Sequence, residues 1–162
     1  MPHPLAMSPH RCDTADRAFA ADFHSGRLRP NDFDHIGHLR LAYVLLCERP
    51  PGAATARYGE ALRAFLAAHG IAADKYHATL TAAWVGAVAH FMRRATPCSS
   101  FAEFRRQARP LDDSRVMLRH YSPRRLYSAP ARRRLLRPDR APIPGLRIPR
   151  RDAAATASPG HG

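Results

Sequence analysis

The sequence predicts an all-α protein, a compact bundle of about five helices followed by an extended, proline-rich C-terminal segment. Apolar residues recur at helical spacing between residues 32 and 94, and no β-type alternation interrupts them. The 162 residues, of which 45% are hydrophobic, suit one domain with a sizeable core. The 15 prolines lie mostly towards the ends of the chain. We assign residues 1–14 to a disordered N-terminal tail, 15–150 to a single helical domain and 151–162 to a disordered C-terminal tail.

Four helices are expected before residue 95. They cover about Thr14–His24, Asp32–Glu48, Ala53–His69 and Asp74–Arg94. Asp32 and Asp74 are the expected N-caps of the second and fourth helices, because an aspartate side chain accepts hydrogen bonds from the first backbone N–H groups. The Pro50-Pro51 pair ends the second helix, and Gly70 follows the third as its C′ residue. The second helix is apolar on most sides, so we expect it at the centre of the bundle.

Shorter elements are expected after Pro97. They are helices at about Ser99–Gln107 and Leu111–His120, one helical turn around Ala131–Leu136 and an extended segment over 138–150. Pro110 separates the first two, because a proline lacks the N–H that a helix interior needs. Four prolines in the extended segment favour a polyproline-like conformation, which we expect to lie on the bundle.

The positive charge is concentrated near the C-terminus. Residues 114–151 hold 12 arginines and a single acid, Asp139, whereas the rest of the chain is near neutral. Such an arm would attract nucleic acid, anionic lipid or an acidic partner at low salt, with Arg124, Arg125 and Arg132–Arg134 as the candidate contacts. The alternative is a solvated segment whose charge has little effect. Nucleic acid is possible but not favoured as a partner.

The three cysteines show no spacing typical of a disulfide framework or a thiolate metal site. The longest apolar runs, Leu41–Cys47 and Ala82–Ala89, fall far below the ~18–20 residues that span a bilayer. The N-terminus has no apolar core of signal-peptide length. We therefore expect a cytoplasmic protein without a membrane partner, and the sequence leaves its oligomeric state open.

Two histidines, His35 and His38, stand three residues apart at the start of the second helix, with about 5–6 Å between their Cβ atoms. Short connections make consecutive helices antiparallel neighbours, so the helices that begin at Asp32 and Asp74 would run the same way. His77 would then lie at the same end of the bundle, where the helix dipole keeps imidazole neutral. The sequence therefore predicts a mononuclear site in which His35, His38 and His77 bind zinc, iron or copper. Alternatively, each histidine is a packed, hydrogen-bonded core residue.

The same topology brings His69 and His120 towards the predicted site. A histidine at a helix C-terminus, such as His69, also has a simple dipole explanation. We take His120 or Tyr121 as the candidate catalytic proton donor, although residues 120–123 could instead form a structural corner. Arg40 is expected to pair with an acid rather than to bind a substrate.

An ordered series of motifs resembles a group of small, uncharacterised bacterial all-helical proteins. The series consists of Phe33-x-His35-x-x-His38-Leu39-Arg40, Tyr76-His77-x-Thr79-x-Thr81, His120-Tyr121-Ser122-Pro123, Ser128-x-x-Ala131-Arg132 and Pro138-Asp139 with Pro142-Ile143-Pro144. The resemblance covers about residues 30–145 and brings no activity with it. It implies that the histidines and the C-terminal segment belong to one folded unit, which weakens the nucleic-acid interpretation of the basic arm.

The function expected first is therefore that of a metalloenzyme acting on a small-molecule substrate. An open coordination position on the metal would activate water or oxygen, as in a hydrolase, lyase or oxygenase. One alternative is a metal- or ligand-binding module, or a partner-binding bundle, without turnover. A further alternative is a nucleic-acid-associated protein that uses the arginines of residues 114–151.

Overall fold

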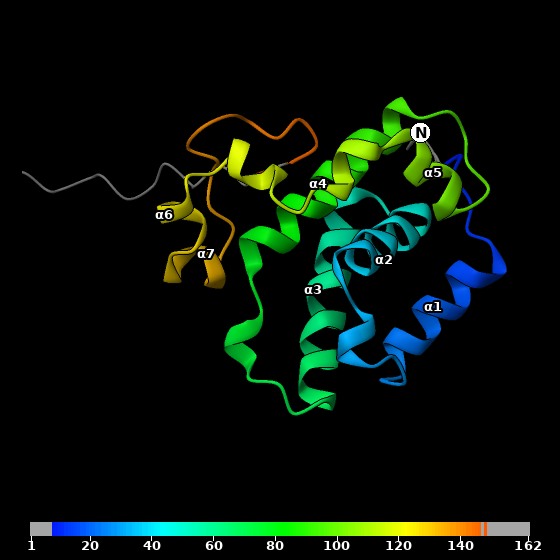
Figure 1. Cartoon of the computed structure of the whole chain (residues 1–162), viewed down its shortest axis with the longest axis horizontal. Coiled ribbons are helices and arrows are strands. Elements are labelled where there is room, and N and C mark those ends of the chain that lie inside the picture. The colour runs from blue at the N-terminus through cyan, green and yellow to red at the C-terminus, as the bar shows by residue number, and fades with distance from the viewer. Residues whose placement is uncertain (1–7, 147, 149–162) are drawn as a thin grey trace, which may run out of the picture.

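The structure, a computed structural model, describes residues 8–146 and 148 (Figure 1). Seven α-helices and four short 3₁₀ turns make up this part of the chain, which contains no strand. The α-helices are α1 (Thr14–His24), α2 (His35–Glu48), α3 (Pro51–Ala68), α4 (Ala78–Arg94), α5 (Phe101–Gln107), α6 (Pro123–Leu126) and α7 (Ala129–Arg133). The predicted all-α fold is confirmed.

Helix α1 begins with a reciprocal cap between two aspartates. The Asp13 side chain accepts from the Asp16 backbone N–H at 2.7 Å, and the Asp16 side chain accepts from the Asp13 N–H at 3.1 Å. Asp16 is buried and also forms an ion pair with Arg40 of α2 at 2.9 Å. A buried carboxylate is stable only when it is paired and hydrogen-bonded, so this contact ties α1 to α2. Arg40 is thus a pairing residue, as predicted.

Two helices begin later than the sequence predicts. Asp32 ends a 3₁₀ turn (Pro30–Asp32), and the N-cap of α2 is Asp34, whose side chain accepts from the Gly37 N–H at 2.9 Å. A second 3₁₀ turn (Ala73–Lys75) contains Asp74, and the N-cap of α4 is His77. An imidazole nitrogen can accept a backbone N–H as a carboxylate does, so several potential caps in a row leave the starting residue open.

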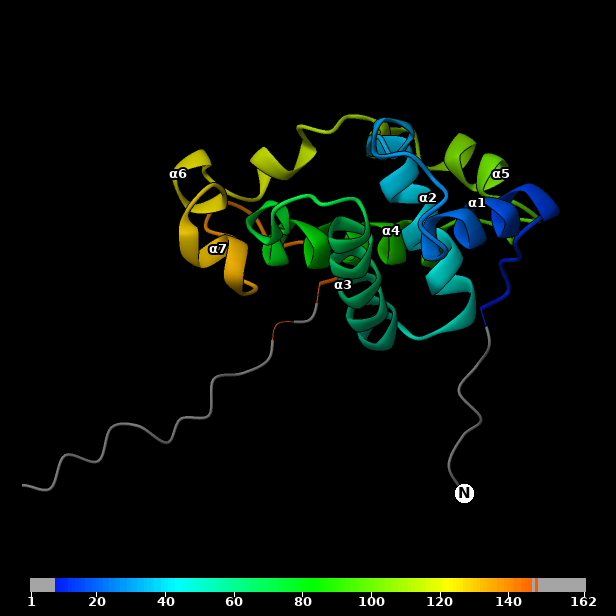
Figure 2. The same cartoon turned by 90° about the horizontal axis from the view of Figure 1, so that it is seen from below.

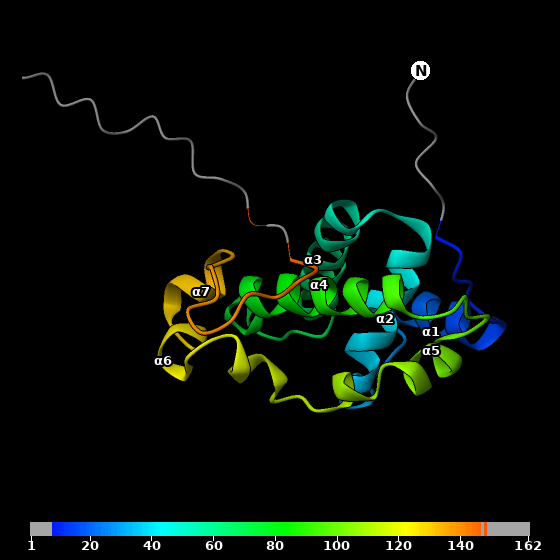
Figure 3. The same ribbon diagram turned by 90° about the horizontal axis from the view of Figure 1, so that it is seen from above.

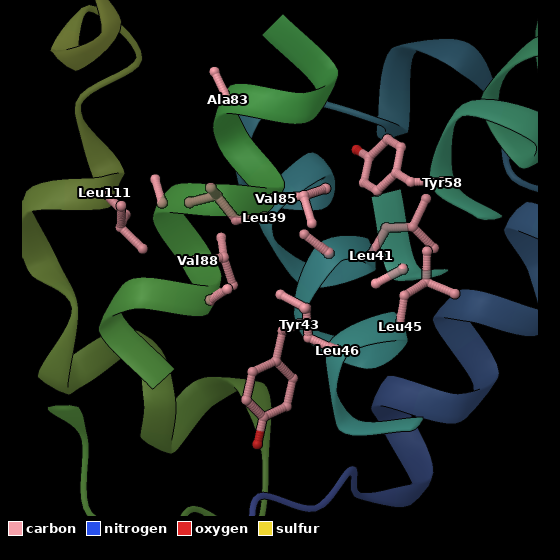
Figure 4. Close-up of a cluster of buried hydrophobic side chains, with 14 of the residues drawn as sticks. Leu39, Leu41, Tyr43, Leu45, Leu46, Tyr58, Ala83, Val85, Val88 and Leu111 are labelled. Atoms are coloured by element: carbon pink, nitrogen blue, oxygen red, sulfur yellow. The ribbon is translucent and has the colours of Figure 1, made fainter. Parts of the chain in front are cut away.

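Helix α2 lies at the centre of the core, as its apolar sequence predicts. Leu41 and Tyr43 are fully buried, and Leu39 is nearly so. Figure 4 shows Leu39, Leu41, Tyr43, Leu45 and Leu46 of α2 beside Tyr58 of α3, Val85 and Val88 of α4, and Leu111. Phe23 of α1 stacks on Phe65 of α3, with ring centroids 4.6 Å apart, and extends this core. Burial of apolar surface from four helices is the main stabilising contribution.

The long helices cross one another instead of running side by side. Helix α4 runs across α3 at a steep angle in all three overall views (Figures 1, 2 and 3). Each of α2, α3 and α4 contacts the other two, so the three form a crossed cluster. The antiparallel arrangement expected from the short connections is therefore not found, because short loops limit the distance between helix ends more than the crossing angle.

The region after α5 contains two 3₁₀ turns where one helix is predicted, and it contains one short α-helix that is not predicted. Instead of a helix at Leu111–His120, two 3₁₀ turns occur, Arg109–Asp112 and Val116–Arg119. The turn expected around Ala131–Leu136 is α7, which begins two residues earlier, after the N-cap Ser128. Helix α6 was not predicted.

The chain on both sides of the helical domain packs against it. Gly145 lies against the backbone of Gly86 in α4 so closely that a Cβ on Gly145 would collide with the Gly86 carbonyl oxygen. His10 is buried, with Nε2 2.7 Å from the Met92 carbonyl oxygen. His10 of the predicted N-terminal tail thus contacts the end of α4, and the disorder predicted for residues 1–14 stays a prediction. Residues 1–7 of that tail and all of 151–162 lie outside the described residues.

Candidate functional site

His35 and His38 both lie in the first turn of α2, but they contact different partners. His35 Nε2 donates to the Leu111 carbonyl oxygen at 2.8 Å, and its ring packs edge-on against Trp84 with centroids 4.6 Å apart. His38 Nδ1 is 2.9 Å from the Tyr58 hydroxyl. Burial, with a smaller contribution from the neighbouring His35, lowers the pKa of His38 to about 4. The His38 ring is therefore neutral at pH 7.

His77 uses both ring nitrogens to hold the backbone. Nδ1 accepts from the Leu80 N–H at 3.1 Å, and Nε2 donates to the Leu126 carbonyl oxygen at 2.8 Å. No nitrogen lone pair is left for a metal. His35 contacts α4 at Trp84, seven residues beyond His77, which corresponds to roughly 10 Å along a helix. The crossing of the helices thus separates the two positions that the predicted metal site requires together.

The predicted proton donors lie in a structural corner. His120 Nδ1 donates to the Ala141 carbonyl oxygen at 3.0 Å. Tyr121 is fully buried, and its hydroxyl donates to the Leu136 carbonyl oxygen at 2.8 Å. Burial raises the pKa of Tyr121 to about 12. These contacts agree with the structural alternative, and the catalytic roles of His120 and Tyr121 stay predictions.

Within residues 8–146 and 148, no three His, Cys, Asp or Glu side chains are grouped so that they could hold a metal ion. His69 caps the C-terminus of α3 and packs on Phe65, with ring centroids 4.6 Å apart. In this part of the chain, His69 Nε2 is the one buried side-chain nitrogen or oxygen without a hydrogen-bond partner. The three-histidine metal site, and the enzyme inferred from it, stay predictions that no described contact supports.

A different cluster of functional groups lies in residues 120–140, here called the arginine-rich cap. The cap contains α6 and α7 and packs against the N-terminal part of α4 (Figures 1 and 2). The Thr79 hydroxyl of α4 donates to the Arg134 carbonyl oxygen at 2.7 Å and accepts from the Leu136 N–H at 3.1 Å. Ala131 of α7 is fully buried. The backbone of the cap is therefore held firmly on the core.

The cap carries seven arginines and one acid. The arginines are Arg124, Arg125, Arg132, Arg133, Arg134, Arg137 and Arg140. Three of them donate to backbone carbonyl groups: Arg125 to Arg137, Arg132 to Asp74 and Arg140 to Leu118. No ion pair joins any of the seven to a carboxylate in the described part of the chain, although arginines elsewhere in it form several. The positive charge of the cap is thus not neutralised by this part of the protein.

An open cleft of about 1170 Å³ lies between the cap and Ile148. Its polar lining is Ser122, Arg124, Arg125, Ser128, Arg134, Arg137 and Asp139, and its apolar lining is Pro130, Leu135, Leu136 and Ile148. Four arginines therefore surround one concavity. An arginine guanidinium presents five N–H donors in a planar fork that matches a phosphate or carboxylate, so the cleft has the chemistry of an anion site.

The other polar groups of the cleft are engaged in structure. Ser122 donates to the Asp139 carboxylate from its hydroxyl at 2.6 Å and from its backbone N–H at 2.8 Å. These two hydrogen bonds lower the pKa of Asp139, which stays ionised at pH 7. The Ser128 hydroxyl donates to the Arg125 carbonyl oxygen at 2.7 Å. The lowered pKa makes Asp139 a weak base for Ser122, and the Ser128 hydroxyl donates to a carbonyl group, so the cleft suits binding better than nucleophilic catalysis.

Tyr127 is the one large hydrophobic side chain exposed in the described residues, with 58% of its surface accessible. In the sequence it directly follows α6 and stands between Arg125 and Ser128, both of which line the cleft. Sequence reasoning singled out Arg124, Arg125 and Arg132–Arg134 but missed Tyr127 and Arg137. The sequence signal for Tyr127 is that an aromatic residue stands between two groups of arginines.

The chain matches no protein-family model, no curated protein and no solved structure, so these comparisons assign it no family. In the described part of the chain, no helix is both long enough and apolar enough to cross a membrane.

Proposed function

We propose that the protein binds nucleic acid through the arginine-rich cap. The observation that carries this proposal is the set of seven cap arginines, none of which pairs with a carboxylate in the described residues. Repulsion among like charges destabilises a compact unit unless a polyanion neutralises them. Binding to nucleic acid would remove this repulsion and release counterions from the phosphates.

The form of the cap favours a nucleic acid over an acidic protein or a lipid surface. Four of its arginines surround a cleft, and an exposed tyrosine, Tyr127, follows two of them in the sequence. Such a mixture of cations and aromatic groups is typical of nucleic-acid sites. The hydrogen bonds from Thr79 and His77 fix the backbone of the cap, so the arginines are presented on a rigid support. A rigid site loses less entropy on binding than a flexible arm does.

The experiment is a binding titration of a fluorescently labelled 20-nucleotide single strand, followed by anisotropy. The variant Arg134→Ala/Arg137→Ala removes two cleft arginines whose side chains make no hydrogen bond or ion pair in the described residues. We expect binding to weaken by at least about tenfold, because each charge-assisted contact to a phosphate contributes substantially.

The matched control is Arg93→Ala/Arg94→Ala, which removes the same charge from exposed arginines in the last turn of α4. Thr79, which holds the cap, lies at the opposite end of that helix. The control should bind like the parent to within about twofold, since only long-range attraction is reduced. Equal losses in the two variants, or no binding by the parent at low salt, would contradict the proposal.

A further inference from the structure

The cleft has two kinds of wall. Arg124, Arg125, Arg134 and Arg137 supply cations, whereas Pro130, Leu135 and Leu136 supply apolar surface. A phosphate group would contact only the cationic wall. A nucleotide base would contact the apolar wall, because the faces of a base are apolar and pack against aliphatic side chains. We propose, on the basis of the nucleic-acid function above, that the cleft takes an unpaired nucleotide, so that the partner is single-stranded.

The size of the cleft agrees with an occupant larger than a phosphate. The cleft is an open concavity of about 1170 Å³, which admits a group much larger than a phosphate. In a duplex, the bases are stacked and paired, so only the sugar–phosphate backbone would face the apolar wall. A single strand can turn a base into the cleft without the cost of unpairing that a duplex requires.

Asp139 gives the cleft a polar acceptor at one edge. Its carboxylate accepts two hydrogen bonds from Ser122, at 2.6 and 2.8 Å, and retains further lone pairs. An ionised carboxylate repels phosphate, but it accepts hydrogen bonds from the amino group of a base or from a sugar hydroxyl. A site for phosphate alone would gain nothing from this residue, whereas a site for a whole nucleotide would.

Tyr127 supplies an exposed aromatic surface one residue before Ser128, which lines the cleft. In the described residues its hydroxyl has no hydrogen-bond partner and its ring packs on no other aromatic side chain, so the fold does not account for it. Stacking of a base on an exposed aromatic ring needs an unpaired base and is independent of sequence. We assign to Tyr127 the base that precedes or follows the nucleotide in the cleft, because the residue next to Tyr127 in the chain, Ser128, lines that cleft.

The test is a competition between a labelled 12-nucleotide single strand and unlabelled competitors of the same sequence. The competitors are single-stranded DNA, single-stranded RNA and a blunt DNA duplex. We expect at least one of the single strands to compete about tenfold better than the duplex. Tyr127→Leu should weaken single-strand binding by about tenfold and leave duplex binding unchanged, since leucine keeps apolar area but cannot stack.

Two results would overturn this inference and leave the nucleic-acid function standing. One is duplex binding as tight as single-strand binding, and the other is unchanged single-strand binding by Tyr127→Leu. Absence of binding to every competitor would instead overturn both the inference and the function on which it rests. Because Tyr127 is exposed, the variant should unfold at the same urea concentration as the parent, which verifies that any loss is local.

Discussion

His77 links the start of α4 to the end of α6 through Leu126. Its Nε2 donates to the Leu126 carbonyl oxygen at 2.8 Å while its Nδ1 caps α4 by accepting from the Leu80 N–H at 3.1 Å. The most prominent of the predicted metal ligands is therefore a structural residue that fastens the arginine-rich cap to the core. His77 thus helps to hold in place the segment that carries the cap arginines.

Replacing His77 should destabilise the fold, and the loss of stability should depend on whether the new residue can cap α4. His77→Ala loses the helix cap and the contact to Leu126, at a cost of about 2–3 kcal/mol in the free energy of unfolding. His77→Asn keeps an N-capping side chain and should cost only about 1 kcal/mol. Urea unfolding followed by circular dichroism measures both free energies of unfolding. Equal stability of the two variants would show that the N-cap of α4 contributes nothing to stability.

Added zinc separates this structural role from the predicted metal site. A metal bound by His35, His38 and His77 would raise the unfolding midpoint of the parent with zinc concentration, and His77→Ala would abolish the rise. We expect the unfolding midpoints of the tag-free parent and of tag-free His77→Ala to be independent of zinc concentration. A zinc-dependent midpoint in the parent alone, together with near-stoichiometric metal by elemental analysis, would restore the metal-site hypothesis.

Stability should fall with acidification because His38 is buried as the neutral imidazole. Its pKa is lowered to about 4, whereas an unfolded histidine has a pKa of about 6.5. Between these values the unfolded state binds more protons than the native state, so stability is full above pH 6.5 and declines as pH falls towards 4. The loss attributable to His38 is about 3 kcal/mol at pH 4.

The matched variant for this prediction is His38→Gln, which keeps a hydrogen-bonding group near the Tyr58 hydroxyl but does not titrate. Its unfolding free energy should depend less steeply on pH between 4 and 6.5. Some slope should persist, because burial also lowers the pKa of His24, His77 and His90. Identical pH profiles for parent and variant would mean that His38 is not the principal titrating group.

Gly145 should be the least replaceable glycine of the described chain. A Cβ there would collide with the carbonyl oxygen of Gly86, which belongs to a helix backbone and cannot move aside. We expect Gly145→Ala to cost about 2–3 kcal/mol of stability through overpacking. Gly52→Ala is the control, because nothing lies within 4 Å of its Cβ position and alanine favours a helix. A harmless Gly145→Ala would mean that residues 143–146 do not pack on α4 in solution.

Cys12 should be the first thiol to react with iodoacetamide. The neighbouring Cys47 thiol lowers the pKa of Cys12, and the thiolate is the reactive form. Burial raises the pKa of Cys98, so Cys98 should react last. Peptide mass spectrometry after timed alkylation gives the order. Cys47→Ala should slow the reaction at Cys12, and an unchanged rate would exclude the thiol–thiol contact as its cause.

The elements that sequence reasoning predicted correctly are those whose signals are local. The interval Thr14–His24 matches α1 residue for residue, and the apolar composition of α2 correctly places it in the core. The starts of α2 and α4 were misplaced because Asp32 and Asp74 compete as caps with Asp34 and His77. Only tertiary contacts decide between adjacent cap candidates.

The candidate site depended on a tertiary feature that the sequence does not contain. The convergence of His35 with His77 required parallel helices, and the crossing angle between helices is set by side-chain packing over both surfaces. The grouping of the cap arginines could not be predicted for a related reason. Their charge is visible in the sequence, but the cleft that groups Arg124 and Arg125 with Arg134 exists only in the folded cap.

The salt dependence of single-strand binding tests the central claim most directly. If the cleft arginines neutralise about three to four phosphates, the logarithm of the association constant should fall with the logarithm of salt concentration with a slope of about −2 to −3. In Arg134→Ala/Arg137→Ala the slope should become shallower by about 1.4, whereas Arg93→Ala/Arg94→Ala should keep the parent value. A parent slope near zero, or the same slope in all three proteins, would contradict nucleic-acid binding by the arginine-rich cap.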